Sequence, residues 1–89
     1  MLKIKTLKES FRGSNYTSAL LHTKDTFSLK YRRLEIRAKL ALGAASWSPF
    51  CLLGSNVITA GWPACGEIDM MKHSGNDQNK ISTLSSAGR

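Results

Sequence analysis

Hydrophobic and polar residues alternate in short runs along the chain, a pattern typical of β-strands. In "YRRLEIRAKL" the apolar residues fall at every second position and charges occupy the positions between them. No helical period continues over the roughly 11 residues that a helix assignment needs. The pattern predicts about six strands, at residues 2–7, 16–22, 26–30 continuing through a bend into 31–40, 47–53, 66–73 and 80–85.

The connections between these runs, "FRGSN", "LGA", "GSN" and "SGNDQN", are rich in residues that accept the dihedral angles of turns. Internal repeats, low-complexity segments and linkers are not visible. We therefore expect one all-β domain over residues 1–89. A chain of this length buries only about 60 to 65% of its unfolded surface, so its stability margin should be thin.

The formal net charge of +7 is high for 89 residues and raises the question of a phosphate-bearing or membrane partner. The charges alternate with apolar residues, as on a solvated strand face, and no helical recognition motif or aromatic-basic interleaving accompanies them. We expect neither nucleic acid nor membrane as a partner. "MLKIKTLKES" lacks the continuous apolar region of a signal peptide, and no run approaches the roughly 20 apolar residues of a membrane span. The expectation is a soluble chain without an export signal.

The segment "GEIDMMKH" places two carboxylates, Glu67 and Asp69, at alternate positions and follows them with Lys72. On a regular strand the two acidic side chains share a face and lie roughly 6.6 Å apart. Taken alone, the segment also fits a solvated strand face with a Glu–Lys pair. Paired acids near flat aromatic residues suggest a sugar site instead.

The two tryptophans are the aromatic residues in question, since an indole can stack on the C–H face of a pyranose ring. Trp47 is followed by apolar residues, so burial and sugar contact both remain open for it. Trp62 lies between Gly61 and Pro63 in what reads as a loop, which favours contact with a ligand.

The two cysteines, Cys51 and Cys65, allow one pairing, and their spacing does not decide whether they meet. A zinc site that combines them with His22 and His73 lacks the close paired-ligand spacing of such sites. The pattern favours two buried or half-buried thiols and no metal site.

Four segments resemble glycoside hydrolase family 16, and within it the laminarinase-like endo-β-1,3(4)-glucanases: "YTSALL…TK", "FSLKYRRLEIRAKL", "SWSPFCLLG" and "GWPACGEIDMMKH". The resemblance runs from about residue 2 to residue 81. It implies a partial β-jelly-roll (concanavalin A-like) antiparallel sandwich that acts on β-glucan polysaccharides or oligosaccharides with retention of configuration. It implies no cofactor beyond a structural calcium ion without an assigned place, and a secreted protein.

The family signature is Glu-x-Asp-x-x-Glu. By this resemblance Glu67 matches the nucleophile and Asp69 the assisting carboxylate, while Lys72 falls on the general acid/base position, where the family has glutamate. Trp47 and Trp62 are the candidate substrate-binding residues. In "SWSPFCLLG", where the family usually reads Trp-Pro-Ala-Phe-Trp, Cys51 replaces the second tryptophan.

The chemistry of this motif can be worked out from the residues. A retaining glycosidase needs two carboxyl groups about 5 to 5.5 Å apart, whereas position 72 of a regular strand points away from Glu67. We therefore expect a one-residue bulge at Met70 or Met71. A charged lysine cannot act as the base that activates water, and Lys72 should form an ion pair with the acids. The sequence predicts a β-glucanase homologue with impaired or no activity; the alternatives are a non-catalytic β-glucan-binding module and a non-functional fragment.

Overall fold

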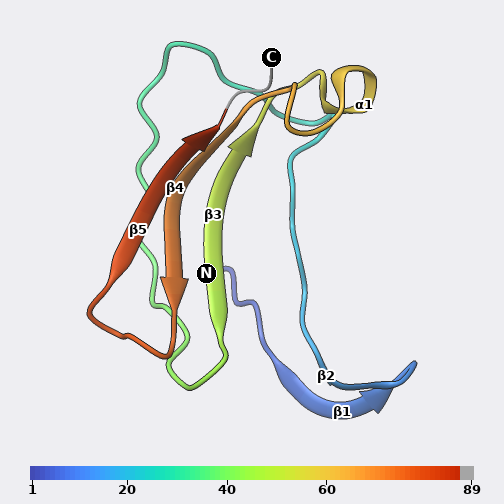
Figure 1. Ribbon diagram of the computed structural model, residues 1–89, viewed down its shortest axis with the longest axis vertical. Coiled ribbons are helices and arrows are strands. Elements are labelled where there is room, and N and C mark those ends of the chain that lie inside the picture. Colours follow the sequence, from blue (N-terminus) through green and yellow to red (C-terminus); the bar gives the residue numbers. More distant parts are fainter. Residues whose placement is uncertain (87–89) are drawn as a thin grey trace.

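The computed structural model describes residues 1–86 and confirms the all-β, antiparallel architecture (Figure 1). Two sheets are present in these residues, one of two strands and one of three. The elements are β1 (Leu7–Phe11), β2 (Ser14–Thr17), β3 (Trp47–Leu53), α1 (Val57–Ala60), β4 (Glu67–Ser74) and β5 (Ile81–Ser86). Across the described residues, no helix has the length and apolar character needed to cross a membrane.

The three-stranded sheet has the order β3-β4-β5, with β4 in the centre, and every pair is antiparallel (Figure 1). The predicted strand at 47–53 is confirmed, and those at 66–73 and 80–85 each lie one residue later in the structure. Pro49 has no N–H to donate to a ladder, but its strand β3 is an edge strand, where proline is tolerated. This sheet carries the whole "GEIDMMKH" segment.

The β1–β2 hairpin closes through a tight turn at Arg12 (φ 46°) and Gly13 (φ 83°). Positive φ at both central residues is the geometry of the type I′ hairpin turn, whose twist matches that of the strands. The residues on either side of this turn pair with each other, from Phe11–Ser14 to Leu7–Thr17. The predicted strands at 2–7 and 16–22 are wrong over most of their length, since residues 2–6 and 18–22 are not in a strand.

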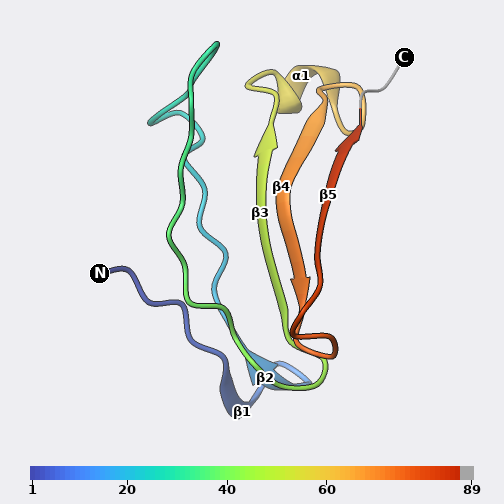
Figure 2. The same ribbon diagram turned by 90° about the vertical axis from the view of Figure 1, so that its left-hand side faces the viewer.

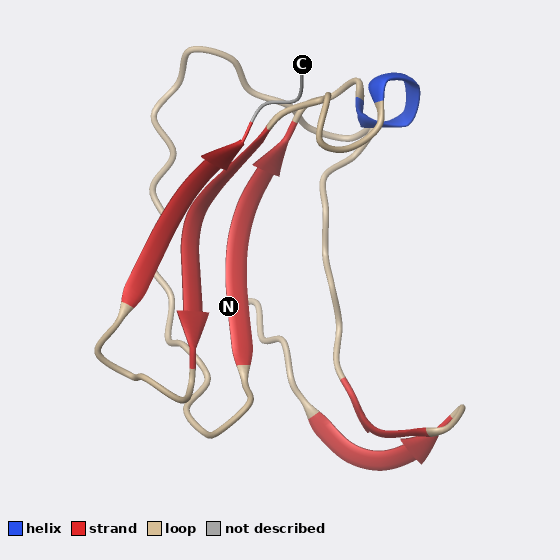
Figure 3. Ribbon diagram, viewed as in Figure 1, coloured by secondary structure: helices blue, strands red, loops and turns tan. Residues whose placement is uncertain are grey.

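The predicted strand over 26–40 is wrong, because residues 18–46 contain no strand. Figure 2 shows this long connection running beside one face of the three-stranded sheet, and Figure 3 marks it as loop throughout. In one of its turns the Thr23 carbonyl accepts from the Thr26 and Phe27 N–H groups, at 3.0 Å each, and in another the Gly43 carbonyl accepts from the Ser46 N–H at 3.2 Å. Alternation of residue types is insufficient for a strand, because the backbone groups also need a ladder partner.

Apolar burial is slight. No hydrophobic side chain among residues 1–86 is buried, and the two buried polar side chains are Asp69 (3% exposed) and His73 (2%). Burial of apolar surface is the main favourable contribution to folding, so the slight burial is in line with the thin stability margin predicted from length, which stays a prediction.

Candidate functional site

Strand β4 contains a bulge at Met70. The pairing of β3 with β4 goes from Phe50–Met71 to Cys51–Asp69, so Met70 has no partner in β3. The pairing of β4 with β5 is irregular over the same interval, between Asp69 and Lys72. The predicted one-residue bulge is confirmed.

The bulge brings the three motif side chains to one face of the sheet. Residues paired across antiparallel strands share a face, as do alternate residues along a strand. The β3 partners of the motif are alternate residues of one strand, in the pairs Leu53–Glu67, Cys51–Asp69 and Pro49–Lys72. Without the extra residue, Lys72 would project from the opposite face.

Lys72 forms an ion pair with Asp69, with 2.6 Å between Nζ and Oδ2. Asp69 is 3% exposed, whereas the Lys72 side chain remains 30% exposed. The contact with Asp69 raises the pKa of Lys72 above its ordinary value, against the opposing effect of partial burial. The group at this position is therefore an ammonium at neutral pH. The expected ion pair is present, and Asp69 is its partner.

Glu67 is held by Trp62. The indole Nε1 donates a hydrogen bond to Oε2 of Glu67 over 2.8 Å. Trp62 lies in the loop that joins α1 to β4, and its side chain is 66% exposed. This contact had no signal in the sequence beyond the five-residue spacing.

Cys51 is the fourth group at this site. Its sulfur and one carboxylate oxygen each of Glu67 and Asp69 lie within 4.8 Å of one another. The pKa of the thiol is raised by partial burial and by the two carboxylates, while Lys72 acts in the opposite direction. Sequence spacing gave no indication of this group, because the three residues meet only through strand pairing.

Both cysteines are free thiols. Cys65 is half-buried, as expected, but the expectation is wrong for Cys51, which lies exposed on an edge strand. The alternative zinc site of sequence analysis, Cys51 and Cys65 with His22 and His73, is not formed in the described residues. His73 is buried and paired with Ser48, one position beyond Lys72 on the strand, so it lies on the opposite face. The cluster of Cys51, Glu67 and Asp69 does not suit a structural calcium ion, because calcium takes oxygen ligands and one of these residues offers sulfur.

A groove of about 390 Å³ adjoins the motif at the Lys72 end of the site. We call it the Trp47 groove. The Trp47 side chain, 59% exposed, lies beside it, so this tryptophan is not a core residue in the structure. A flat indole next to ammonium and hydroxyl groups suits the apolar face and the hydroxyls of a sugar ring. The groove is lined by Trp47, Lys72, Ser74, Asp77, Lys80 and Ser82.

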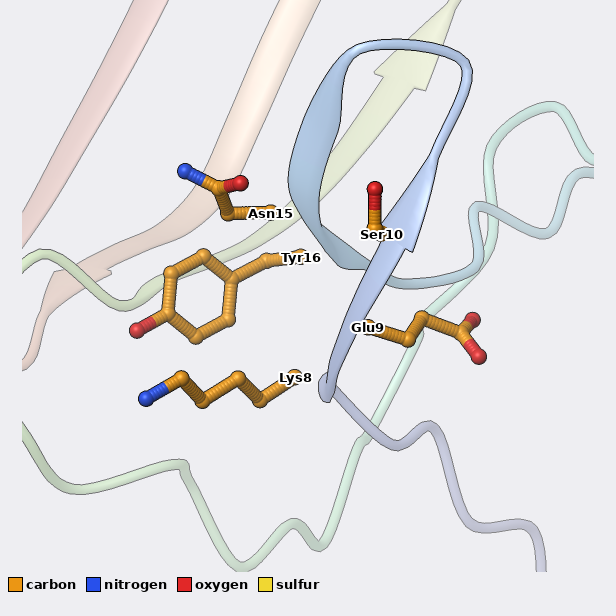
Figure 4. Close-up of a pocket in the computed structure, with 5 residues that line it drawn as sticks. All are labelled: Lys8, Glu9, Ser10, Asn15 and Tyr16. Atoms are coloured by element: carbon orange, nitrogen blue, oxygen red, sulfur yellow. The ribbon is translucent and has the colours of Figure 1, made fainter.

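A larger hollow, of about 520 Å³, lies on the β1–β2 hairpin (Figure 4). Lys8 and Tyr16, paired across the hairpin, extend toward one side of it, and Glu9 extends toward the other. None of the residues predicted for the site lines this hollow, whose lining is Lys8, Glu9, Ser10, Asn15 and Tyr16. We therefore place the candidate site on the β3–β4 face.

Comparison with known proteins finds relatives among glucanases and a glucan-binding protein. The chain is 38% identical over 71 residues to the glucan endo-1,3-beta-glucosidase A1 of Niallia circulans, which is 80% of the chain and 10% of the relative. It is 44% identical over 61 residues to the beta-1,3-glucan-binding protein of Penaeus monodon, 68% of the chain and 17% of the relative. It is 40% identical over 77 residues to the beta-glucanase of Rhodothermus marinus, 84% of the chain and 27% of the relative.

No family model matches the chain. The chain spans between 10% and 27% of the length of these three curated relatives. The relatives support a glucanase-like origin, and the catalytic and binding roles of the individual residues stay predictions.

Proposed function

We propose that this chain is part of a β-glucan-directed protein of the glycoside hydrolase family 16 type, whose β3–β4 face binds glucan and whose hydrolytic step is impaired. One observation carries the proposal: the bulge at Met70 brings Glu67, Asp69 and Lys72 to one face of the sheet. A strand that served only as a solvated surface would not need this bulge, which changes the face of the sheet on which the following side chains lie. The identity of the chain to three glucan-related proteins supports the substrate class.

In the proposed site Glu67 is the nucleophile that attacks the anomeric carbon. The Trp62 indole engages one of its two carboxylate oxygens, and this limits the rotation of the group. Asp69 is the assisting carboxylate. It lies between Glu67 and Lys72 on β4, and its burial keeps its position defined. A retaining mechanism also requires a second catalytic carboxyl group, about 5 to 5.5 Å from the first.

Lys72 occupies the position of that second group. It cannot take a proton from water while it is an ammonium, and its ion pair with Asp69 strengthens its hold on the proton. Loss of a general acid/base costs roughly 10² to 10⁴ in rate. We therefore expect hydrolysis of ordinary β-glucans to be severely slowed, while binding does not require this proton transfer.

Glucan binding in the proposal uses the Trp47 groove. Its indole supplies an apolar platform, and Ser74 and Ser82 supply hydroxyl groups at the groove wall. Trp62 is exposed next to Glu67, so its ring face is available for a second sugar.

A second candidate function is glucan binding without hydrolysis. Two observations favour it: Lys72 at the acid/base position, and the 44% identity to a protein named as a beta-1,3-glucan-binding protein. The two candidates share the surface and differ in whether products are released.

The proposal is tested with a soluble β-1,3-glucan oligosaccharide and two matched variants. Trp47→Ala removes the groove platform. Tyr16→Ala removes an equally exposed aromatic residue, 59% in both cases, from the separate hollow on the hairpin. Ligand that binds only the folded state should raise the melting temperature of the parent and of Tyr16→Ala, and have little effect on Trp47→Ala.

Assay of released sugar then separates the candidates. Slow product formation supports an impaired hydrolase, and saturable binding without products supports a binding module. A cooperative melt whose melting temperature does not change with glucan contradicts both candidate functions. A melt without cooperativity identifies the chain by itself as a non-functional fragment.

A further inference from the structure

We propose that Cys51, Glu67 and Asp69 form a zinc-binding site on the β3–β4 face. The proposal stands on the arrangement of these side chains and does not depend on glucan binding. Ligand atoms of the three residues lie within 4.8 Å of one another. Zinc in tetrahedral coordination holds sulfur at about 2.3 Å and carboxylate oxygen at about 2.0 to 2.2 Å, which places neighbouring ligand atoms roughly 3.5 Å apart. Small side-chain rotations close that difference.

The backbone that carries the three ligands is well suited to a metal site. Cys51 and Asp69 are direct partners in the β3–β4 ladder, and Glu67 lies two positions along the same face of β4. Asp69 is almost completely buried, so one ligand is fixed by its surroundings. Side chains on paired strands are held more accurately than side chains on loops, which is what a metal site requires.

Both carboxylates already have a second partner of the kind that orients metal ligands. Lys72 contacts Asp69 through Oδ2, and Trp62 donates to Oε2 of Glu67. A carboxylate has two oxygens, so each residue can keep this partner and still offer an oxygen to a metal. Hydrogen-bonded outer partners of this type fix ligand orientation and typically contribute 10- to 100-fold in metal affinity.

The charge balance also favours a divalent cation. Zinc binding displaces the proton of the Cys51 thiol into the solvent. The resulting thiolate and the two carboxylates carry three negative charges, and the ammonium of Lys72 compensates one of them. A doubly charged ion neutralises the remainder. Sulfur among the ligands selects zinc over calcium or magnesium, which prefer oxygen alone. With three protein ligands, the fourth zinc position is left to water.

The test is titration of the reduced protein with zinc chloride, followed by calorimetry, on the parent and on two cysteine variants. Cys51→Ser removes the proposed sulfur ligand. Cys65→Ser is the matched control, because the Cys65 thiol instead donates to the Gly66 carbonyl and lies outside the cluster. We expect one zinc per chain for the parent and for Cys65→Ser, and at least a tenfold weaker affinity for Cys51→Ser.

Cadmium gives an independent readout, since a cadmium–thiolate bond adds an ultraviolet charge-transfer band. The band should develop in the parent and in Cys65→Ser and be absent in Cys51→Ser. Glu67→Gln, which keeps the size of the side chain, should also weaken zinc binding and serves if Cys51→Ser fails to give the parent circular dichroism spectrum. Absence of zinc binding by the parent, equal loss in both cysteine variants, or a band that survives Cys51→Ser overturns the proposal.

Discussion

Lys72 and Asp69 form an ion pair across the bulge of β4, with Nζ 2.6 Å from Oδ2. Asp69 is buried, and a buried carboxylate is costly unless a charged or hydrogen-bonding partner accompanies it. The lysine therefore compensates the buried charge at the same position where the related enzymes are expected to hold a catalytic glutamate. Its replacement should affect stability and chemistry together.

Lys72→Glu should raise the rate of glucan hydrolysis by roughly 10² to 10⁴, because it supplies a carboxyl group at the proposed acid/base position. It should also lower stability, since three carboxylates then share one face and Asp69 loses its cation. Release of reducing sugar from laminarin measures the first effect and urea denaturation the second. Lys8→Glu makes the same change of charge on the separate hairpin and is the control. If Lys72→Glu folds and is no faster than the parent, Lys72 is not what limits activity.

The pH dependence of alkylation of Cys51 should report on the two carboxylates beside the thiol. Because they and partial burial raise the pKa of the thiol above its usual 9.0, the rate of alkylation by iodoacetamide should reach half its maximum above pH 9.0. Cys65→Ser provides a background with a single thiol. In that background Glu67→Gln should move the midpoint to lower pH, since one negative charge is removed, and Lys72→Met should move it to higher pH. Shifts in the opposite directions would contradict the arrangement of charges at the site.

Trp62→Phe should loosen the loop before β4. The change keeps an aromatic ring and removes the N–H that Glu67 accepts. A hydrogen bond contributes about 0.5 to 1.5 kcal/mol, so local opening of residues 61–66 should become about 2- to 10-fold more frequent. Amide hydrogen exchange measures this opening. Trp47→Phe is the control, because none of the hydrogen bonds described in residues 1–86 involves the Trp47 indole. Equal exchange rates in the two variants would show that the indole bond does not hold the loop.

Gly54→Ala should destabilise the connection between β3 and β4, next to the candidate site. A Cβ at residue 54 would lie 2.0 Å from the carbonyl oxygen of Cys65, where Gly54 donates to Gly66 over 3.1 Å and closes the β3–β4 connection. Backbone atoms cannot turn aside as a side chain can, so the strands must separate, at a cost of about 1 to 3 kcal/mol. Urea denaturation of Gly54→Ala and of the neighbouring control Ser55→Ala measures the difference. A loss no greater than that of the control would mean that the connection can shift without cost.

The sequence predicted the three strands of the larger sheet well because turn residues bound each run and each run finds its partner nearby in the chain. A bulge at Met70 or Met71 was predictable for a different reason, and the structure places it at Met70. The chemistry expected of the motif required positions 67 and 72 to share a face, and an extra residue corrects the phase of a strand. The strand expected over 26–40 failed because its alternation of charges and apolar residues describes a surface and says nothing about a ladder partner.

Sequence alone determined the residue types of the site, the all-β character and the presence of a cation where a carboxylate is expected. The tertiary structure decided which of these residues contact one another. Trp62 holds Glu67, Lys72 pairs with Asp69, and the thiol of Cys51 lies beside both carboxylates. These contacts depend on the register between β3 and β4, in which residues 18 positions apart become direct neighbours at Cys51 and Asp69. Register is a property of two paired strands, and neither strand specifies it without the other.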